Sequence, residues 1–327
     1  MAGGIGSSDF DFDFDFDFDF STGSPSAGGR GSVRPMGVSP ALATVPDANG
    51  VMEDWYHGNK WPPADFATQW ANASPGPRDF PRRYWDSRLY AITILGEFVL
   101  VNDNTGKPRW NQFATSLDTL LPKAKVDIDA ELDELVTLIE YRPGVMAEAM
   151  AQRTNPWAYF RGILMCNSAS APYTHDLVEV ASVIGQFQAM HYKRHFSRPR
   201  PSQYSPALLP QIDVPGHASF PSGHATEANL IALCLAKVLP PAARTPVVGF
   251  APAHAPPPYP GISPLQQMAQ RIARNREVLG LHFPSDSKAG MLLAAESLDI
   301  LMQCKSIYDP VNPKHGLLSK AADEWWP

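Results

Sequence analysis

The chain has 327 residues, of which 44% are hydrophobic and 18% charged, enough to form a sizeable buried core. Its formal net charge of −6 equals the contribution of six aspartates in one repeat, so the remainder is near neutral. A neutral remainder gives no signal for nucleic acid or for a charged membrane surface. No apolar run reaches the roughly 18 residues of a membrane span, and no basic segment followed by an apolar stretch marks a signal peptide. We therefore expect a soluble protein, and the sequence does not indicate its cellular compartment.

Residues 1–24 form the first of three predicted segments and contain a low-complexity repeat. Six Asp-Phe pairs run from Asp9 to Phe20 between Gly- and Ser-rich flanks. In an extended strand this alternation would place every Phe on one face and every Asp on the other. Two interpretations stay open, a disordered acidic tail or a strand that stacks between chains into a homo-oligomeric filament through residues 9–20. Stacked aspartates repel unless they are protonated or bridged by a cation such as Ca²⁺. The candidate cation ligands are Asp9, Asp11, Asp13, Asp15, Asp17 and Asp19.

Residues 25–80 are rich in Pro, Gly, Ser and Ala and predict an extended arm. Residues 81–327 follow a helical pattern and predict an all-α helical bundle as the third segment. The predicted helices span 81–101, 111–121, 128–141, 143–153, 156–167, 173–196, 224–239, 264–280 and 285–304. Cys166, Cys234 and Cys304 lie far apart in apolar contexts, so we expect small buried side chains and no disulfide framework.

The stretch from Phe220 to Thr226 opens a long apolar helix and predicts an anion site. Ser222 is placed as the N-cap, with Gly223 and His224 in the first turn. A helix N-terminus exposes unpaired N–H groups and a partial positive charge, which suit an oxyanion. A capping serine beside an incidental histidine would give the same pattern.

Two other segments carry basic and imidazole side chains. The segment 193–201 ends a long helix with Lys193 and Arg200, and a basic helix end also complements the helix dipole without any further function. The segment 275–286 contains Arg276, His282 and Asp286, and the aspartate follows the histidine by four residues, a spacing that suits orienting its imidazole. Together the three segments supply the donors that bind a tetrahedral oxyanion.

These motifs are Lys-x6-Arg-Pro, Pro-Ser-Gly-His and Asn-Arg-x5-His-x3-Asp, in this order. They resemble the three-part signature of the type 2 phosphatidic acid phosphatase (PAP2) and vanadium-dependent haloperoxidase superfamily. The resemblance covers residues 193–286 and implies that superfamily's all-α fold. One departure is Asn275, which stands where the phosphatases usually carry Ser.

The resemblance implies a role for each matched residue. Lys193, Arg200 and Arg276 would hold the oxyanion, with hydrogen bonds from Ser222 and from the backbone of Gly223. In a phosphatase, which needs no cofactor, His282 would be the nucleophile, His224 would protonate the leaving group and Asp286 would fix the tautomer of His282. In a haloperoxidase the pocket would hold vanadate, with His282 as the axial vanadium ligand and His224 as the acid–base catalyst.

The local sequence favours the haloperoxidase chemistry. His217 lies seven residues before His224, where algal bromoperoxidases carry a histidine, and is the candidate halide-site residue. Residues 285–290 are instead similar to the acid phosphatases. We therefore expect a haloperoxidase-like enzyme that oxidises halide with hydrogen peroxide. The alternatives are a soluble PAP2-type acid phosphatase that hydrolyses phosphomonoesters through a phosphohistidine, and a filament-forming structural protein that displays the enzyme domain. Either enzyme would take a small-molecule substrate.

Overall fold

The chain divides into two units, and the computed structural model describes residues 45–46, 52–53, 86–240 and 263–325. In the unit of residues 19–85, β1 (Val45–Pro46) pairs antiparallel with β2 (Met52–Glu53), with Val45 opposite Glu53. Both strands fall within the segment that the sequence predicts as an extended arm. The Asp-Phe repeat, with its candidate cation ligands, lies outside the described residues, so its order and its filament role stay predictions.

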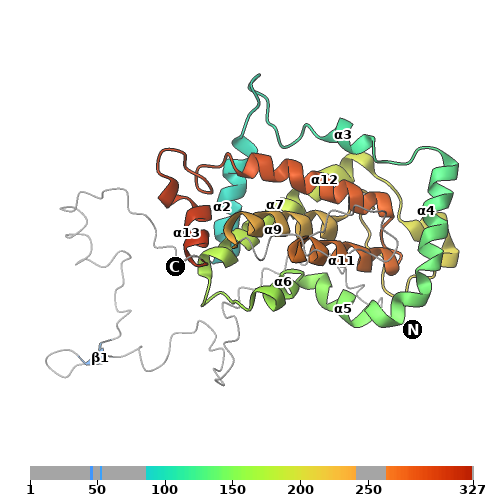
Figure 1. The fold of residues 1–327 in the computed structure, drawn as a ribbon, viewed down its shortest axis with the longest axis horizontal. Helices are drawn as coiled ribbons and strands as arrows, with labels where there is room; N and C mark the ends of the chain where they lie inside the picture. The colour runs from blue at the N-terminus through green and yellow to red at the C-terminus, as the bar shows by residue number, and fades with distance from the viewer. Residues whose placement is uncertain (1–44, 47–51, 54–85, 241–262, 326–327) are drawn as a thin grey trace. The chain divides into compact units, whose positions relative to one another are not determined.

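The described part of the other unit is all-α, as the sequence predicts (Figure 1). Its α-helices are α2 (Ser87–Leu100), α3 (Ala114–Asp118), α4 (Lys125–Thr137), α5 (Arg142–Thr154), α6 (Trp157–Leu164), α7 (Pro172–Phe196), α8 (Pro201–Tyr204), α9 (Gly223–Val238), α11 (Pro264–Val278), α12 (Pro284–Leu301) and α13 (Leu317–Asp323). Short 3₁₀ turns occupy η3 (Ile139–Tyr141), η4 (Pro206–Leu208) and η5 (Pro313–His315).

Helix α9 is the central helix of this unit and packs against α7, α11 and α12 (Figure 1). Most of its side chains are buried, which explains why its sequence is apolar around nearly the whole circumference. Leu230, Ile231 and Leu235 share one core with Ile184 of α7 and Leu293 of α12. The helix that opens with Ser222 is therefore held rigidly by its neighbours.

Gly290 allows α12 to approach the first turn of α9. A Cβ at this position would lie 2.8 Å from the Ser222 carbonyl oxygen and 2.9 Å from the Thr226 nitrogen, closer than real Cβ contacts come. One turn earlier on α12, the Asp286 carbonyl accepts a 3.0 Å hydrogen bond from the Ser222 N–H. This close contact joins the second and third sequence motifs.

Three predicted helices begin three or more residues away from their predicted start, and the one predicted over 111–121 is the 5-residue helix α3. The helix predicted over 81–101 begins at Ser87, because the Asp86 carboxylate accepts from the backbone N–H of Arg88 (2.8 Å) and Leu89 (3.2 Å) and caps it there. The helix predicted over 128–141 begins at Lys125 instead, and its last residues form the separate turn η3.

The sequence analysis did not predict α13, whose 7 residues are too few to show a helical period. Leu317 and Ala321 of α13 are buried. Glu324, just after it, caps the start of α7, since its carboxylate accepts from the N–H groups of Tyr173 (2.7 Å) and Thr174 (2.8 Å). Residues 317–324 thus hold one end of the helix whose other end carries the first sequence motif.

Within the described residues, no helix is both long and apolar enough to cross a bilayer. The three cysteines are free, with Cys234 and Cys304 buried and Cys166 half-buried, as predicted. Burial raises the pKa of the Cys234 and Cys304 thiols to about 12, so both behave as small apolar side chains.

Candidate active site

The three sequence motifs meet around the N-terminus of α9. The last turn of α7 supplies Lys193, the end of α11 supplies Arg276, and the corner from α11 to α12 supplies His282 and Asp286. Arg200 precedes the short helix α8. Apart from Gly223, which has no side chain, each predicted catalytic or oxyanion-binding residue exposes less than a tenth of its surface. The structure therefore gathers these polar groups in the interior, where unpaired charge is expensive and an anion is strongly favoured.

Ser222 and Gly223 stand where the sequence places them. Ser222 is the N-cap of α9, with its hydroxyl accepting from the Ala225 N–H at 3.3 Å, and Gly223 is the first helical residue. Their hydrogen bonds to an oxyanion stay a prediction.

His282 and Asp286 form a buried dyad on the corner between α11 and α12. Asp286 Oδ2 lies 3.1 Å from His282 Nδ1 and also accepts from the Phe283 N–H at 2.9 Å. Gly280 makes the bend possible with φ +73°, and a Cβ there would lie 3.0 Å from Nη2 of buried Arg142. Because a carboxylate can only accept, the dyad fixes the His282 proton on Nδ1 and leaves the lone pair on Nε2.

The Nε2 atom of His282 faces the guanidinium of Arg200. Arg200 Nη1 lies 3.2 Å from this atom and donates to the Leu281 carbonyl at 2.9 Å. Its Nη2 lies 3.0 Å from His217 Nδ1, so the candidate halide-site residue is half-buried beside the same cation. Burial and the charges of Lys193 and Arg200 lower the pKa of His217 to about 3, so its imidazole is neutral.

Lys193 and Arg276 are also held by backbone carbonyls. Lys193 Nζ donates to the carbonyls of Ala218 (2.7 Å) and Ser219 (3.2 Å), and Arg276 Nη2 donates to the Ala149 carbonyl of α5. These acceptors are neutral, so they orient the side chains without cancelling their charge. A tetrahedral oxyanion is the ligand class that matches such a set of cations.

The charges of these cations help to lower the pKa values of both His282 and His224. Burial, followed by the charges of Arg200 and Lys193, holds the pKa of His282 well below its ordinary value. Burial, followed by the charge of Arg276, does the same to the pKa of His224. Both imidazoles are therefore neutral, and the field around them is positive.

His224 is held as the opposite tautomer to His282. Its Nε2 lies 3.3 Å from the Arg153 carbonyl in the last turn of α5. Since a carbonyl oxygen only accepts, the proton of neutral His224 is on Nε2, and Nδ1 is the atom that can take up a further proton. The negative end of the α5 dipole favours the charged imidazolium that this would create.

Comparison with known proteins agrees with this geometry. The sequence profile of the PAP2 superfamily matches residues 177–306. This part of the chain is a PAP2 superfamily domain. The chain is also 33% identical over 109 residues to the decaprenylphosphoryl-5-phosphoribose phosphatases of two Mycobacterium tuberculosis strains, CDC 1551 / Oshkosh and ATCC 25618 / H37Rv. The aligned part is 33% of this chain and 48% of each relative, so the chain spans about half the length of the curated relatives it matches.

Helices outside the matched PAP2 segment complete the site. The carbonyls of Ala149 and Arg153, which hold Arg276 and His224, belong to α5. Asn275 also turns toward α5, where its amide donates to Glu148 (3.0 Å) and Gln152 (2.9 Å). The departure from the phosphatase pattern at Asn275 therefore serves to join α11 to α5.

Three site residues were missing from the sequence prediction. Arg198, inside the first motif, donates to Asp286 Oδ1 at 2.7 Å, and the Ser219 hydroxyl donates to Asp286 Oδ2. Glu131 of α4 accepts from Arg198 Nη2 at 2.9 Å. The basic segment 193–201 could have pointed to Arg198, whereas Glu131 lies 67 residues from its partner and carries no local signal.

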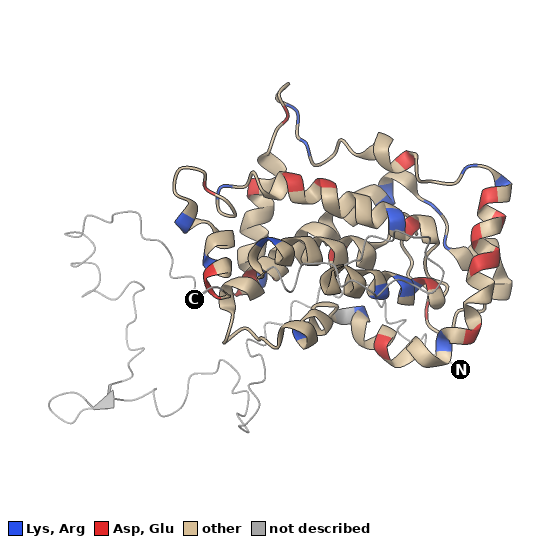
Figure 2. Ribbon diagram, viewed as in Figure 1, with Lys and Arg blue, Asp and Glu red and all other residues tan. Residues whose placement is uncertain are grey.

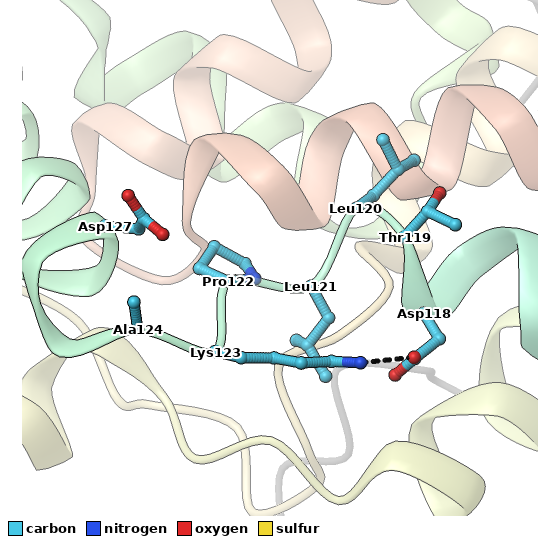
Figure 3. A pocket seen from close by; sticks show the side chains of 8 residues that line it. All are labelled: Asp118, Thr119, Leu120, Leu121, Pro122, Lys123, Ala124 and Asp127. Atoms are coloured by element: carbon cyan, nitrogen blue, oxygen red, sulfur yellow. Dashed lines mark hydrogen bonds and ion pairs between the residues drawn. The ribbon is translucent and has the colours of Figure 1, made fainter.

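A surface hollow of about 580 Å³ lies on the connection from α3 to α4 (Figure 3). It is lined by residues 118–124 and Asp127, with an ion pair between Lys123 and Asp118 across it. None of its lining residues belongs to the PAP2 site. In the described part of the chain, no group of three or more His, Cys, Asp or Glu side chains is placed to hold a metal ion.

Proposed function

We propose that this chain is a phosphatase that hydrolyses small phosphomonoesters through a phosphohistidine on His282. The observation that carries the proposal is the placement of His282, with Nδ1 fixed on Asp286 and Nε2 at 3.2 Å from the Arg200 guanidinium. A phosphoryl group held by the cations would present phosphorus to a neutral nitrogen lone pair. The PAP2 match and the phosphatase names of the two relatives support this alternative over the haloperoxidase that the sequence analysis favoured.

The reaction runs in two steps that use the two histidines in turn. His282 Nε2 attacks phosphorus, the ester P–O bond breaks, and a proton from His224 goes to the departing alkoxide. Asp286 stabilises the positive charge that forms on the His282 ring. Water then attacks the phosphohistidine, His224 takes its proton, and phosphate leaves.

The first step needs a protonated His224, and substrate binding itself causes this protonation. The charge of Arg276 helps to hold the pKa of His224 low. A bound phosphate dianion offsets that charge, so the pKa of His224 rises and its Nδ1 takes up a proton. The Arg153 carbonyl keeps the other nitrogen in place during this change.

The test is turnover of p-nitrophenyl phosphate and of an alkyl phosphate, with chemical trapping of acid-labile phosphohistidine. We expect His282→Ala to abolish both turnover and trapping. His224→Ala should slow the alkyl ester by about 10²–10⁴-fold, because alkoxide needs the acid, and the nitrophenyl ester by less. His195→Ala, at an exposed histidine of α7, is the control and should match the wild type. Turnover that survives in His282→Ala would overturn the proposal.

The haloperoxidase remains the second candidate, supported by His217 beside Arg200. The same residues fit vanadate, which is also a tetrahedral oxyanion; Lys193, Arg200 and Arg276 would hold it and His282 would bind its vanadium. Vanadate would supply the peroxide-activating chemistry. Bromination of a dimedone-type reporter that depends on added orthovanadate would favour this candidate, whereas vanadate that only inhibits phosphate release would favour the phosphatase.

A further inference from the structure

Arg198 lies between two carboxylates directly behind the His282–Asp286 dyad. Its Nη1 donates to Asp286 Oδ1 at 2.7 Å, and its Nη2 donates to Glu131 Oε2 at 2.9 Å. The guanidinium also stacks on Phe283, with 3.7 Å from its carbon to the ring centre. The side chains of Arg198, Glu131 and Asp286 are 4%, 14% and 0% exposed, so these ion pairs are hardly screened by water.

Glu131 also fixes the first turn of α12. Its Oε1 accepts from the Ser285 N–H at 2.7 Å, and its Oε2 accepts from the Ser285 hydroxyl at 2.9 Å. Arg198 Nη1 in turn donates to that hydroxyl at 2.7 Å. Acidic residues recur along α4 (red in Figure 2), but Glu131 is the one that these contacts join to the dyad.

We propose that Arg198 and Glu131 are positioning residues that hold Asp286 ionised and correctly oriented, and through it keep the lone pair of His282 on Nε2. The proposal deepens the phosphatase function and rests on it.

The contacts divide the two oxygens of Asp286 between two tasks. Oδ2 accepts from His282, the Phe283 N–H and the Ser219 hydroxyl, and Oδ1 accepts from Arg198. Without Arg198, Oδ1 would be a fully buried anionic oxygen with its charge-assisted donor removed, so the carboxylate would turn or take a proton. Either change would loosen the bond that fixes the His282 tautomer.

Glu131 offsets part of the positive charge of Arg198. Arg198 alone would neutralise Asp286 and draw it away from His282. With Glu131 present, the three side chains carry one net negative charge, which remains available to the positive ring that forms when Nε2 is phosphorylated. This assigns a role to α4, which precedes the matched PAP2 segment of 177–306.

The experiment compares Glu131→Gln with Asp129→Asn. Both exchanges are isosteric and remove one negative charge from α4, but the Asp129 side chain is 49% exposed and pairs only with Lys125 among the ion pairs described. We expect Glu131→Gln to lower kcat by about 10- to 100-fold with KM little changed, by analogy with the loss seen when the outer partners of metal-binding histidines are replaced. Asp129→Asn should leave both constants at wild-type values.

Arg198→Gln and Arg198→Lys complete the set. Arg198→Gln removes both the positive charge and the paired donors of the guanidinium. Arg198→Lys keeps the charge but has a single donor nitrogen, so it should recover part of the kcat that Arg198→Gln loses. Nuclear magnetic resonance of full-length protein labelled with ¹⁵N-histidine reads the tautomer of His282 without any turnover. The wild type and Asp129→Asn should show the proton on Nδ1, and Glu131→Gln and Arg198→Gln should show a mixture of tautomers.

These readouts separate the inference from the phosphatase function. If the wild type shows no turnover but the His282 tautomer still shifts in Glu131→Gln and Arg198→Gln, the phosphatase function is refuted and the positioning role stands. Normal kcat and an unchanged tautomer in folded Glu131→Gln would overturn the positioning role in an active enzyme. If Arg198→Gln fails to fold, the comparison of Glu131→Gln with Asp129→Asn decides alone.

Discussion

Replacing Gly290 with alanine tests whether the close contact of α12 and α9 builds the site. The new Cβ would lie 2.8 Å from the Ser222 carbonyl oxygen, 2.9 Å from Ala225 Cβ and 2.9 Å from the Thr226 nitrogen. Two of these atoms are backbone, so α12 must move away from the start of α9. Gly96→Ala is the matched control, because Gly96 lies on the exposed face of α2 and its Cβ would meet nothing within 4 Å.

The expected difference in stability follows from two opposing effects. Both exchanges gain about 1 kcal/mol of helix propensity, whereas overpacking at Gly290 costs about 1–3 kcal/mol. Propensity cancels when the variants are compared, so Gly290→Ala should be about 1–3 kcal/mol less stable than Gly96→Ala. At about 2–4 °C per kcal/mol for a unit of this size, the melting midpoints should differ by roughly 2–12 °C.

Activity should separate the two variants further. Asp286 lies one turn before Gly290, and a displacement of about 1 Å at a catalytic group can lower the rate about 100-fold. Differential scanning calorimetry and turnover of p-nitrophenyl phosphate measure the two effects. Equal midpoints and equal turnover in the two alanine variants would refute the claim that this contact aligns the second and third motifs.

Four other outcomes are expected. Ser222→Ala should lower the free energy of unfolding by about 1 kcal/mol through loss of the N-cap, measured by denaturant titration, and should weaken phosphate binding. Sulfate, a tetrahedral dianion that does not titrate near neutral pH, should bind with proton uptake and more tightly at lower pH, because it offsets the charge of Arg276 that lowers the pKa of His224. Calorimetry in buffers of different ionisation enthalpy measures this uptake, which His224→Gln should reduce. Without an anion, the free energy of unfolding should fall as pH drops below about 6.5. Below this pH the imidazoles of His224 and His282 bind protons in the unfolded state but stay neutral in the folded state, where their pKa values are lower. Deletion of residues 1–24 should abolish calcium- or acid-dependent filaments in sedimentation, and identical sedimentation of both chains in every buffer would end the assembly prediction.

The sequence was enough to predict most of the helices and to single out the residues that the structure brings together around the start of α9. Ser222 as N-cap and the four-residue spacing from His282 to Asp286 are local signals, and the structure confirms both of them. The ends of helices were less predictable, since Asp86 caps α2 so that the helix begins at Ser87, six residues after its predicted start. Helix α13 is too short to carry a period of its own.

The supporting part of the site could not be predicted, for two physical reasons. Glu131 meets Ser285 across 154 residues of chain, and no spacing rule reports a contact of that range. Ala149 and Arg153 act through backbone carbonyls, which every residue type has, so their identity says nothing of the role. A motif therefore finds the side chains at the centre of the site and misses the groups that orient them.

In the proposed mechanism, the orienting groups give the two histidines different tasks. Asp286 accepts from Nδ1 of His282 and frees Nε2 for attack, whereas the Arg153 carbonyl accepts from Nε2 of His224 and frees Nδ1 for proton transfer. A nucleophile needs a neutral ring, which burial beside Arg200 enforces. An acid needs a ring that becomes charged when the anion arrives, and the carbonyl end of α5 supports that charge. The proposed division of labour thus depends on the Asp286 carboxylate behind one imidazole and the C-terminus of α5 behind the other.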